Sequence, residues 1–337
     1  DMKKILVTLG PRSLNKEIIE EMTEYDIYLF RINLSHTELE NVEEYVNIIK
    51  KSTDVSICLD SEGAQIRCQQ VNNGRVMFEQ NNVVKIHFDE IIADENNISF
   101  SPRGVAKQFV VGDIVKIDFN LAMLKILETH RTYCLAKVLA GGEVKNNKAA
   151  DLQRELKLPS ITEKDKNAFK LGKKLGVNHF ALSFASSKQD LLLCRDMVGN
   201  DTKIISKIES KQGLLNLKNI VDYSDELLID RGDLSRQVPI EKVPFFQRRI
   251  ISICRLYDKP IYVATNLLES MIELAVPNRA EVNDVVSTLL MGADGLVLAA
   301  ETAIGKYPIE SVKVIRKLCE SSKRWTPNTS IDEILEM

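Results

Sequence analysis

The chain has 337 residues, of which 44% are hydrophobic and 28% are charged. This is the composition of an ordinary globular protein, and it excludes a disordered chain, a collagen-like repeat and a short disulfide scaffold. The 45 basic and 48 acidic residues give a formal net charge of −3, which does not indicate binding to nucleic acid or to a membrane surface.

Short runs of β-branched and aliphatic residues alternate along the chain with longer amphipathic segments, a pattern typical of βα units around a parallel sheet. We predict eight strands, at residues 3–8, 27–32, 55–60, 179–183, 203–208, 226–230, 260–265 and 294–299. Helices are predicted at residues 16–25, 38–50, 163–175, 188–198, 245–257, 279–291 and 309–324. Eight such units close a barrel, so the predicted fold class is α/β, a (β/α)8 TIM barrel.

This alternation of strands and helices stops between residues 68 and 142, where the segments are short, alternate between apolar and polar residues and are separated by glycines. Runs at 83–88 and 114–119 indicate antiparallel strands, and we predict a small all-β domain inserted after the third barrel strand. The alternative is one long irregular loop, which is rare inside a compact domain. The expected organisation is a first barrel part at 1–67, the inserted β lid domain at 68–145 and a second barrel part at 146–337, with no further domain.

No apolar run approaches the roughly 18 residues of a membrane-spanning helix, and the first residues lack the apolar core of a signal peptide. We therefore expect a cytoplasmic protein. The six cysteines form no C-x-x-C pair, and the four histidines show no metal-ligand spacing. The thiols are interpreted mostly as small buried apolar residues.

The active sites of barrel enzymes lie at the carboxyl ends of the strands. Polar residues accumulate at these predicted ends: Thr8, Arg31, Asn33, Ser35, Asp60, Ser61, Ser183, Lys207, Glu209, Asp233, Thr265 and Glu301. A single polar strand end is explained equally well by the polarity of loops, whereas the whole set favours a site.

Two acids and two cations in this set suggest a chemistry. Glu209 and Asp233 suit a hard divalent ion such as magnesium. Arg31 and Lys207 would grip phosphoryl oxygens and neutralise their developing charge, so phosphoryl transfer is the leading hypothesis. The alternative is that Lys207 and Asp233 form only a structural ion pair. No Walker loop or kinase-type glycine loop occurs, so a nucleotide would need another binding place.

Nine short segments follow one another along the chain: Thr8–Pro11, Arg31–His36, Leu59–Arg67, Leu158–Asp165, Ser206–Glu209, Arg231–Leu234, Ala264–Met271, Arg279–Val285 and Glu301–Pro308. Together they resemble the pyruvate kinase family over nearly the whole chain. They are similar to its T-x-G-P, R-x-N-x-S-H and S-K-I-E motifs, among others. Nine matches in one order are very hard to obtain by chance.

The resemblance implies transfer of the phosphoryl group of phosphoenolpyruvate to ADP, which gives pyruvate and ATP. The implied catalytic residues are Lys207, Arg31 and Thr265, and the substrate-binding residues are Gly232, Asp233, Arg31 and Thr265. Magnesium or manganese would be held by Glu209 and Asp233, and potassium by Asn33, Ser35, Asp60 and Ser61. The nucleotide would contact Thr8, Pro11, His36, Arg67 and Lys148. The inserted domain would be a lid that excludes water, and a homo-oligomer is left open.

Several positions depart from the family pattern. The family's carboxy-terminal regulatory domain has no counterpart here, so regulation by that route is not expected. Glu62 and Gln65 replace a lysine and an acidic residue, and the acidic residue goes with potassium dependence in relatives. Asp230 stands where the family has alanine, and its charge is expected to weaken phosphoenolpyruvate binding or to recruit a different cation. The segment 148–154 loses two glycines and a proline at the hinge to the lid.

Three alternatives remain beside a pyruvate kinase. The phosphoryl machinery could serve a different acceptor in a specialised pathway, since the nucleotide-facing segments changed more than the metal-facing ones. The chain could be an inactive binding protein with this fold. It could also be a magnesium-dependent aldolase on a related barrel, but Lys207 and the R-x-N-x-S-H segment argue against that interpretation.

Overall fold

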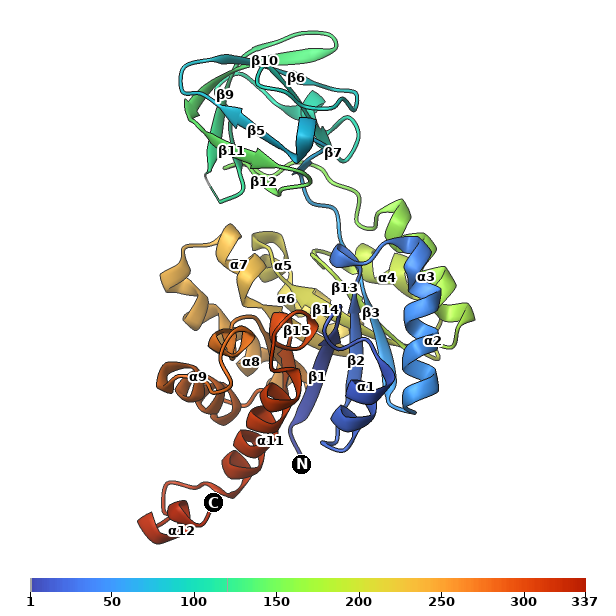
Figure 1. Cartoon of the computed structure of the whole chain (residues 1–337), viewed down its shortest axis with the longest axis vertical. Coiled ribbons are helices and arrows are strands. Elements are labelled where there is room, and N and C mark those ends of the chain that lie inside the picture. Colours follow the sequence, from blue (N-terminus) through green and yellow to red (C-terminus); the bar gives the residue numbers. More distant parts are fainter. Residues whose placement is uncertain (1, 120) are drawn as a thin grey trace. The chain divides into compact units, whose positions relative to one another are not determined.

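The computed structural model describes residues 2–119 and 121–337, which form two compact units. The barrel unit comprises Asp1–Gly63 and Ile161–Met337, and the β unit comprises Ala64–Ser160. In Figure 1, where the colours follow the sequence, the β unit is cyan to green, and the two segments of the barrel unit are blue and yellow-green to red. The chain leaves the barrel after its third strand, as predicted.

Eight parallel strands close the barrel in the order β1-β17-β16-β15-β14-β13-β3-β2. Their bounds are β1 (Lys4–Leu9), β2 (Leu29–Asn33), β3 (Ser56–Asp60), β13 (His179–Leu182), β14 (Lys203–Ile208), β15 (Glu226–Asp230), β16 (Ile261–Ala264) and β17 (Gly295–Leu298). Each predicted strand is found, because buried strands of a parallel sheet are continuous apolar runs. The predicted α/β TIM barrel is confirmed.

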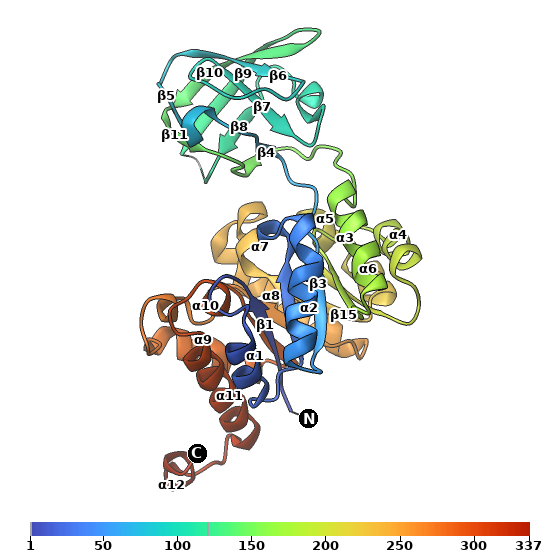
Figure 2. The ribbon, with the colours of Figure 1, turned by 45° about the vertical axis from the view of Figure 1, so that its right-hand side comes forward.

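Helices surround the barrel on its outside (Figure 2). The helices of the barrel unit are α1 (Lys16–Thr23), α2 (Val42–Ser52), α3 (Glu163–Lys174), α4 (Lys188–Val198), α5 (Lys211–Leu215), α6 (Leu217–Tyr223), α7 (Arg231–Gln237), α8 (Val243–Leu256), α9 (Arg279–Leu290), α10 (Ala300–Ala303), α11 (Pro308–Arg324) and α12 (Ile331–Leu335). Of these, α12 lies beyond α11 in the carboxy-terminal tail, away from the barrel (Figure 2). The predicted helices correspond to α1 to α4, α8, α9 and α11. The others span seven residues at most, too short for a helical period to show.

The strand register explains why polar side chains gather at one end of the barrel. Nine apolar residues pack together inside it: Leu6, Leu29, Cys58, Ala181, Ile205, Leu228, Tyr262, Ala264 and Val297. Residues two apart in a strand point to the same face. Two positions beyond six of these residues, towards the carboxyl ends, lie Thr8, Arg31, Asp60, Ser183, Lys207 and Asp230.

The β unit has its own hydrophobic core. One sheet has the order β12-β8-β9-β10-β6-β7-β4, and β11 pairs with β5 in a second sheet. The strands are β4 (Arg67–Cys68), β5 (Arg75–Phe78), β6 (Val83–His87), β7 (Asn97–Ser101), β8 (Ile114–Ile117), β9 (Ala122–Thr129), β10 (Tyr133–Ala140), β11 (Gly142–Lys145) and β12 (Ala150–Asp151). The unit reaches beyond the expected 68–145 at both ends, since β4 pairs with β7 and β12 with β8.

All six cysteines are buried and free. Among the described residues, no helix has both the length and the apolar character needed to cross a membrane.

Candidate active site

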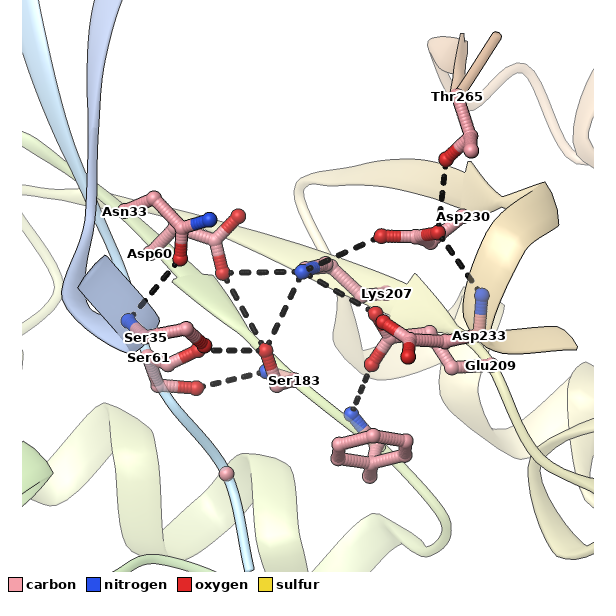
Figure 3. A network of polar contacts seen from close by, with 12 residues as sticks. Asn33, Ser35, Asp60, Ser61, Ser183, Lys207, Glu209, Asp230, Asp233 and Thr265 are labelled. Carbon is pink, nitrogen blue, oxygen red and sulfur yellow. Dashed lines mark hydrogen bonds and ion pairs between the residues drawn. The ribbon is translucent and has the colours of Figure 1, made fainter. Parts of the chain in front are cut away.

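Lys207, at the carboxyl end of β14, is the centre of a buried charge network (Figure 3). Its Nζ atom lies 3.2 Å from Asp60 Oδ1, 3.1 Å from Glu209 Oε1 and 3.8 Å from Asp230 Oδ2. It also donates a hydrogen bond of 3.3 Å to Ser183 Oγ. Burial opposes the charge, but Asp60, Glu209 and Asp230 outweigh it and raise the pKa of Lys207. The lysine is therefore a fixed cation at neutral pH.

Arg31 provides a second fixed cation from β2. Its Nε donates to Asp60 Oδ2 at 2.6 Å, and its Nη1 donates to Thr8 Oγ1 at 2.7 Å. Burial works against the guanidinium charge, but Asp60 dominates and raises the pKa of Arg31. Asp60 therefore binds one cation with each carboxylate oxygen, and this fixes the two positive groups relative to each other.

Glu209, Asp230 and Asp233 form an acidic group on the other side of Lys207 (Figure 3). Each contributes a carboxylate oxygen, and these oxygens lie within 4.8 Å of one another. Glu209 is fully buried, and its burial, together with Asp233 and Asp230, raises its pKa against the effect of Lys207. A divalent cation would stabilise the ionised form, and closely spaced carboxylate oxygens are the ligands that magnesium prefers. The residues therefore fit the implied metal.

Thr265 follows β16 and faces the acidic group. Its Oγ1 donates to Asp230 Oδ1 at 2.9 Å, and the Asp233 backbone N–H donates to the same oxygen at 3.1 Å. The Thr265 backbone has a φ of +86°, a conformation that L side chains rarely adopt. A Cβ atom on Gly232 would lie only 2.9 Å from Thr265 Cγ2, so a larger residue there would displace the threonine side chain.

The comparisons with known proteins identify the family. The sequence model for "Pyruvate kinase, barrel domain" matches residues 1–312. A pyruvate kinase of Thermotoga maritima is 35% identical over 330 residues, which cover 95% of this chain and 71% of the relative. One from Clostridium perfringens is 31% identical over 331 residues and one from Bacillus licheniformis 32% over 332, covering 70% and 57% of those proteins.

This chain belongs to the pyruvate kinase family. It is a pyruvate kinase-like phosphotransferase.

The four residues implied for a monovalent cation lie at the carboxyl ends of the adjacent strands β2 and β3. Asn33 pairs with Asp60 in the strand register, and its Oδ1 accepts from the Ser35 N–H at 3.1 Å. Ser61 Oγ accepts from the Ser183 N–H at 2.8 Å. The set is thus gathered in one place, and most of its oxygens already accept hydrogen bonds.

The residues that the pyruvate kinase resemblance assigns to the nucleotide are divided between the two units. Thr8 is buried against Arg31, whereas Pro11 and His36 are exposed on the barrel unit. Arg67 and Lys148 belong to the β unit. There, Arg67 Nη2 donates to Gln65 Oε1 at 2.6 Å, and Lys148 Nζ lies 4.0 Å from Asp118.

Two groups for which no role was predicted hold the site in place. Arg231 binds both carboxylate oxygens of Asp284, at 2.8 and 2.9 Å, and donates to the Thr265 carbonyl. Asp165, fully buried, accepts from the Glu62 and Gly63 N–H groups at 2.8 and 2.9 Å, directly after β3. Their position inside the motif segments could have pointed to these charged residues.

Proposed function

We propose that the chain transfers the phosphoryl group of phosphoenolpyruvate to ADP and protonates the remaining enolate at its terminal carbon to give pyruvate. The bond between phosphorus and the enol oxygen breaks, and a bond to an oxygen of the ADP β-phosphate forms. The observation that carries this proposal is the position of Lys207 Nζ, between Asp60 on one side and the acidic group on the other.

Arg31 and Lys207 would hold the phosphoryl oxygens, because both are fixed cations anchored on Asp60. Such groups stabilise a transition state in which negative charge is spread over the phosphoryl oxygens. Glu209 and Asp233 would hold magnesium or manganese. When bound, the divalent ion supplies electrophilic stabilisation of oxygen charge. Potassium would be held by Asn33, Ser35, Asp60 and Ser61.

The substrate carboxylate would meet the N–H groups of Gly232 and Asp233, with Thr265 beside it and beside the carbon that receives the proton. The Arg231–Asp284 pair supports this assignment, because it holds the backbone of Thr265 in an uncommon conformation. ADP would be contacted by Thr8, Pro11, His36, Arg67 and Lys148. A cytoplasmic role in glycolysis stays a prediction.

The direct test is a coupled assay in which lactate dehydrogenase consumes the pyruvate formed from phosphoenolpyruvate and ADP with magnesium. Runs with and without potassium test the monovalent site. Turnover that needs a divalent ion supports the proposal. Folded protein that binds phosphoenolpyruvate but gives no pyruvate with any nucleoside diphosphate would contradict ADP as acceptor. Protein that binds neither substrate would indicate a non-catalytic role.

A further inference from the structure

Asp230, the last residue of β15, is an acid that the proposed reaction does not use. Its Oδ1 accepts one hydrogen bond from the Thr265 hydroxyl at 2.9 Å and another from the Asp233 N–H at 3.1 Å. Its Oδ2 lies 3.8 Å from Lys207 Nζ. A Cβ atom on Gly232 would lie 3.4 Å from Asp230 Oδ1, so this oxygen also lies close to the Gly232 backbone.

These contacts coincide with those that the proposed function gives to the substrate. The Asp233 N–H, Gly232 and Thr265 would surround the substrate carboxylate, and all three already adjoin Asp230 Oδ1. A threonine hydroxyl has one proton to donate, and so does a backbone N–H. Both protons point to Asp230, so a substrate carboxylate would have to compete for them.

The charges make this competition stronger. The Asp230 side chain lies 3.8 Å from the Lys207 ammonium group and accepts two hydrogen bonds through Oδ1, contacts that suit a carboxylate. A second carboxylate close to it would be repelled. The same two donors cannot satisfy both groups.

We propose that Asp230 is a specificity-determining residue whose carboxylate occupies the place of the substrate carboxylate. Phosphoenolpyruvate must displace it to bind, so Asp230 lowers the affinity of the site for ligands that carry a carboxylate. This inference rests on the proposed function. It implies a high KM for phosphoenolpyruvate in the natural chain. Replacing Asp230 should therefore change KM strongly and kcat little.

Asp230 also caps the amino end of α7. A residue with only this role would affect stability and leave the affinity for phosphoenolpyruvate unchanged. A residue acting only through its charge would weaken the binding of every anion to the same extent. In the proposed role, Asp230 instead weakens the binding of a carboxylate more than the binding of a phosphate. This difference distinguishes the three roles.

The experiment compares Asp230→Ala and Asp230→Asn with the natural chain at saturating magnesium. We expect Asp230→Ala to lower the KM for phosphoenolpyruvate at least tenfold. It should strengthen inhibition by oxalate, a small dicarboxylate, at least tenfold more than inhibition by inorganic phosphate. Asp230→Asn keeps the helix cap and a side-chain oxygen, so it should give an intermediate gain, and it carries the test if the alanine variant is unfolded. Glu241→Ala, an exposed change of the same charge, should alter neither constant.

Three outcomes would contradict the proposed role of Asp230 or the proposed function. An unchanged KM in Asp230→Ala and Asp230→Asn, with normal turnover, overturns the inference and leaves the proposed function standing. Equal gains for oxalate and phosphate also overturn it, because charge alone then accounts for the effect. Absence of pyruvate formation in the natural chain and in both folded variants overturns the proposed function itself.

Discussion

The two ends of the barrel interior use similar residues for different purposes. At the amino ends of the strands, Glu226 is buried and accepts hydrogen bonds from the Tyr28 and Tyr262 hydroxyls. Lys203 Nζ lies 3.3 Å from its carboxylate, and Lys4 Nζ lies 4.1 Å from the centre of the Tyr28 ring. Each charge there has a partner within the chain.

At the carboxyl ends the balance is different. Four carboxylates, those of Asp60, Glu209, Asp230 and Asp233, surround Lys207 and Arg31, with Arg236 3.8 Å from Asp233. The acids outnumber the cations, and burial raises the pKa of Glu209. An apolar layer separates the two ends. We conclude that the carboxyl-end network, in which several buried acids share one lysine, marks the functional site, whereas the amino-end network, in which two tyrosine hydroxyls and a lysine hold a single buried acid, stabilises the fold.

The largest effect is expected at Lys207. Lys207→Met should lower the rate of phosphoryl transfer about a thousandfold, because a cation that stabilises the transition state is lost. The coupled assay measures this effect. Lys203→Met is a matched control, since Lys203 lies on the same strand and face at the opposite end. Its rate should stay within about twofold of the natural rate. Unfolding of Lys207→Met would show instead that Lys207 is structural.

Glu226→Gln should reverse this pattern. The change removes a buried charge that accepts two tyrosine hydroxyls, so the free energy of unfolding should fall by about 2 kcal/mol. Urea denaturation at pH 7 measures the loss, and kcat should not change. Glu241→Gln, on the exposed surface, should alter stability by less than about 0.5 kcal/mol. A loss of activity without a loss of stability in Glu226→Gln would contradict the comparison.

A smaller effect is expected where the active site is positioned through a second residue. Asp284→Asn weakens the two-oxygen contact with Arg231 and so loosens Thr265, and we expect kcat to fall about tenfold. The KM for magnesium should stay the same, because Asp284 does not belong to the acidic group. Asp284→Glu should recover part of the rate. An equal loss in the asparagine and glutamate variants would argue against positioning through Arg231.

The smallest effect is expected on the pH dependence of stability, through His179 at the amino ends of the strands. Burial, helped by Lys203 and Lys4 and opposed by Glu226, lowers the pKa of His179. The unfolded chain therefore binds a proton near pH 6.5 that the folded chain does not bind. Stability should fall as the pH falls below about 6.5, until the folded pKa is reached. In His179→Gln this part of the pH dependence should disappear from urea denaturation curves. A persistent slope would assign it to other groups.

The sequence could predict the barrel because each strand is a buried apolar run with a polar carboxyl end. It could also predict the residues that meet at Lys207, because strand register brings ends together. The contact between Asp230 and Thr265 could not be foreseen, since it depends on side-chain orientation around two separate loops. Arg231 and Asp284 lie 53 residues apart, and no periodic pattern connects such a pair. The limits of the β unit depend on the short edge strands β4 and β12, which are two residues long.

The Asp165 carboxylate bears on how the barrel tolerates the inserted β unit. It joins the point where the polypeptide leaves the barrel, at Glu62 and Gly63, to the start of α3, where the polypeptide returns. Lys164 reinforces this junction through Glu62 at 2.9 Å. The exit and the return are therefore tied within the barrel itself, so the insertion between them can vary in length or be exchanged during evolution without altering the scaffold that holds the catalytic groups.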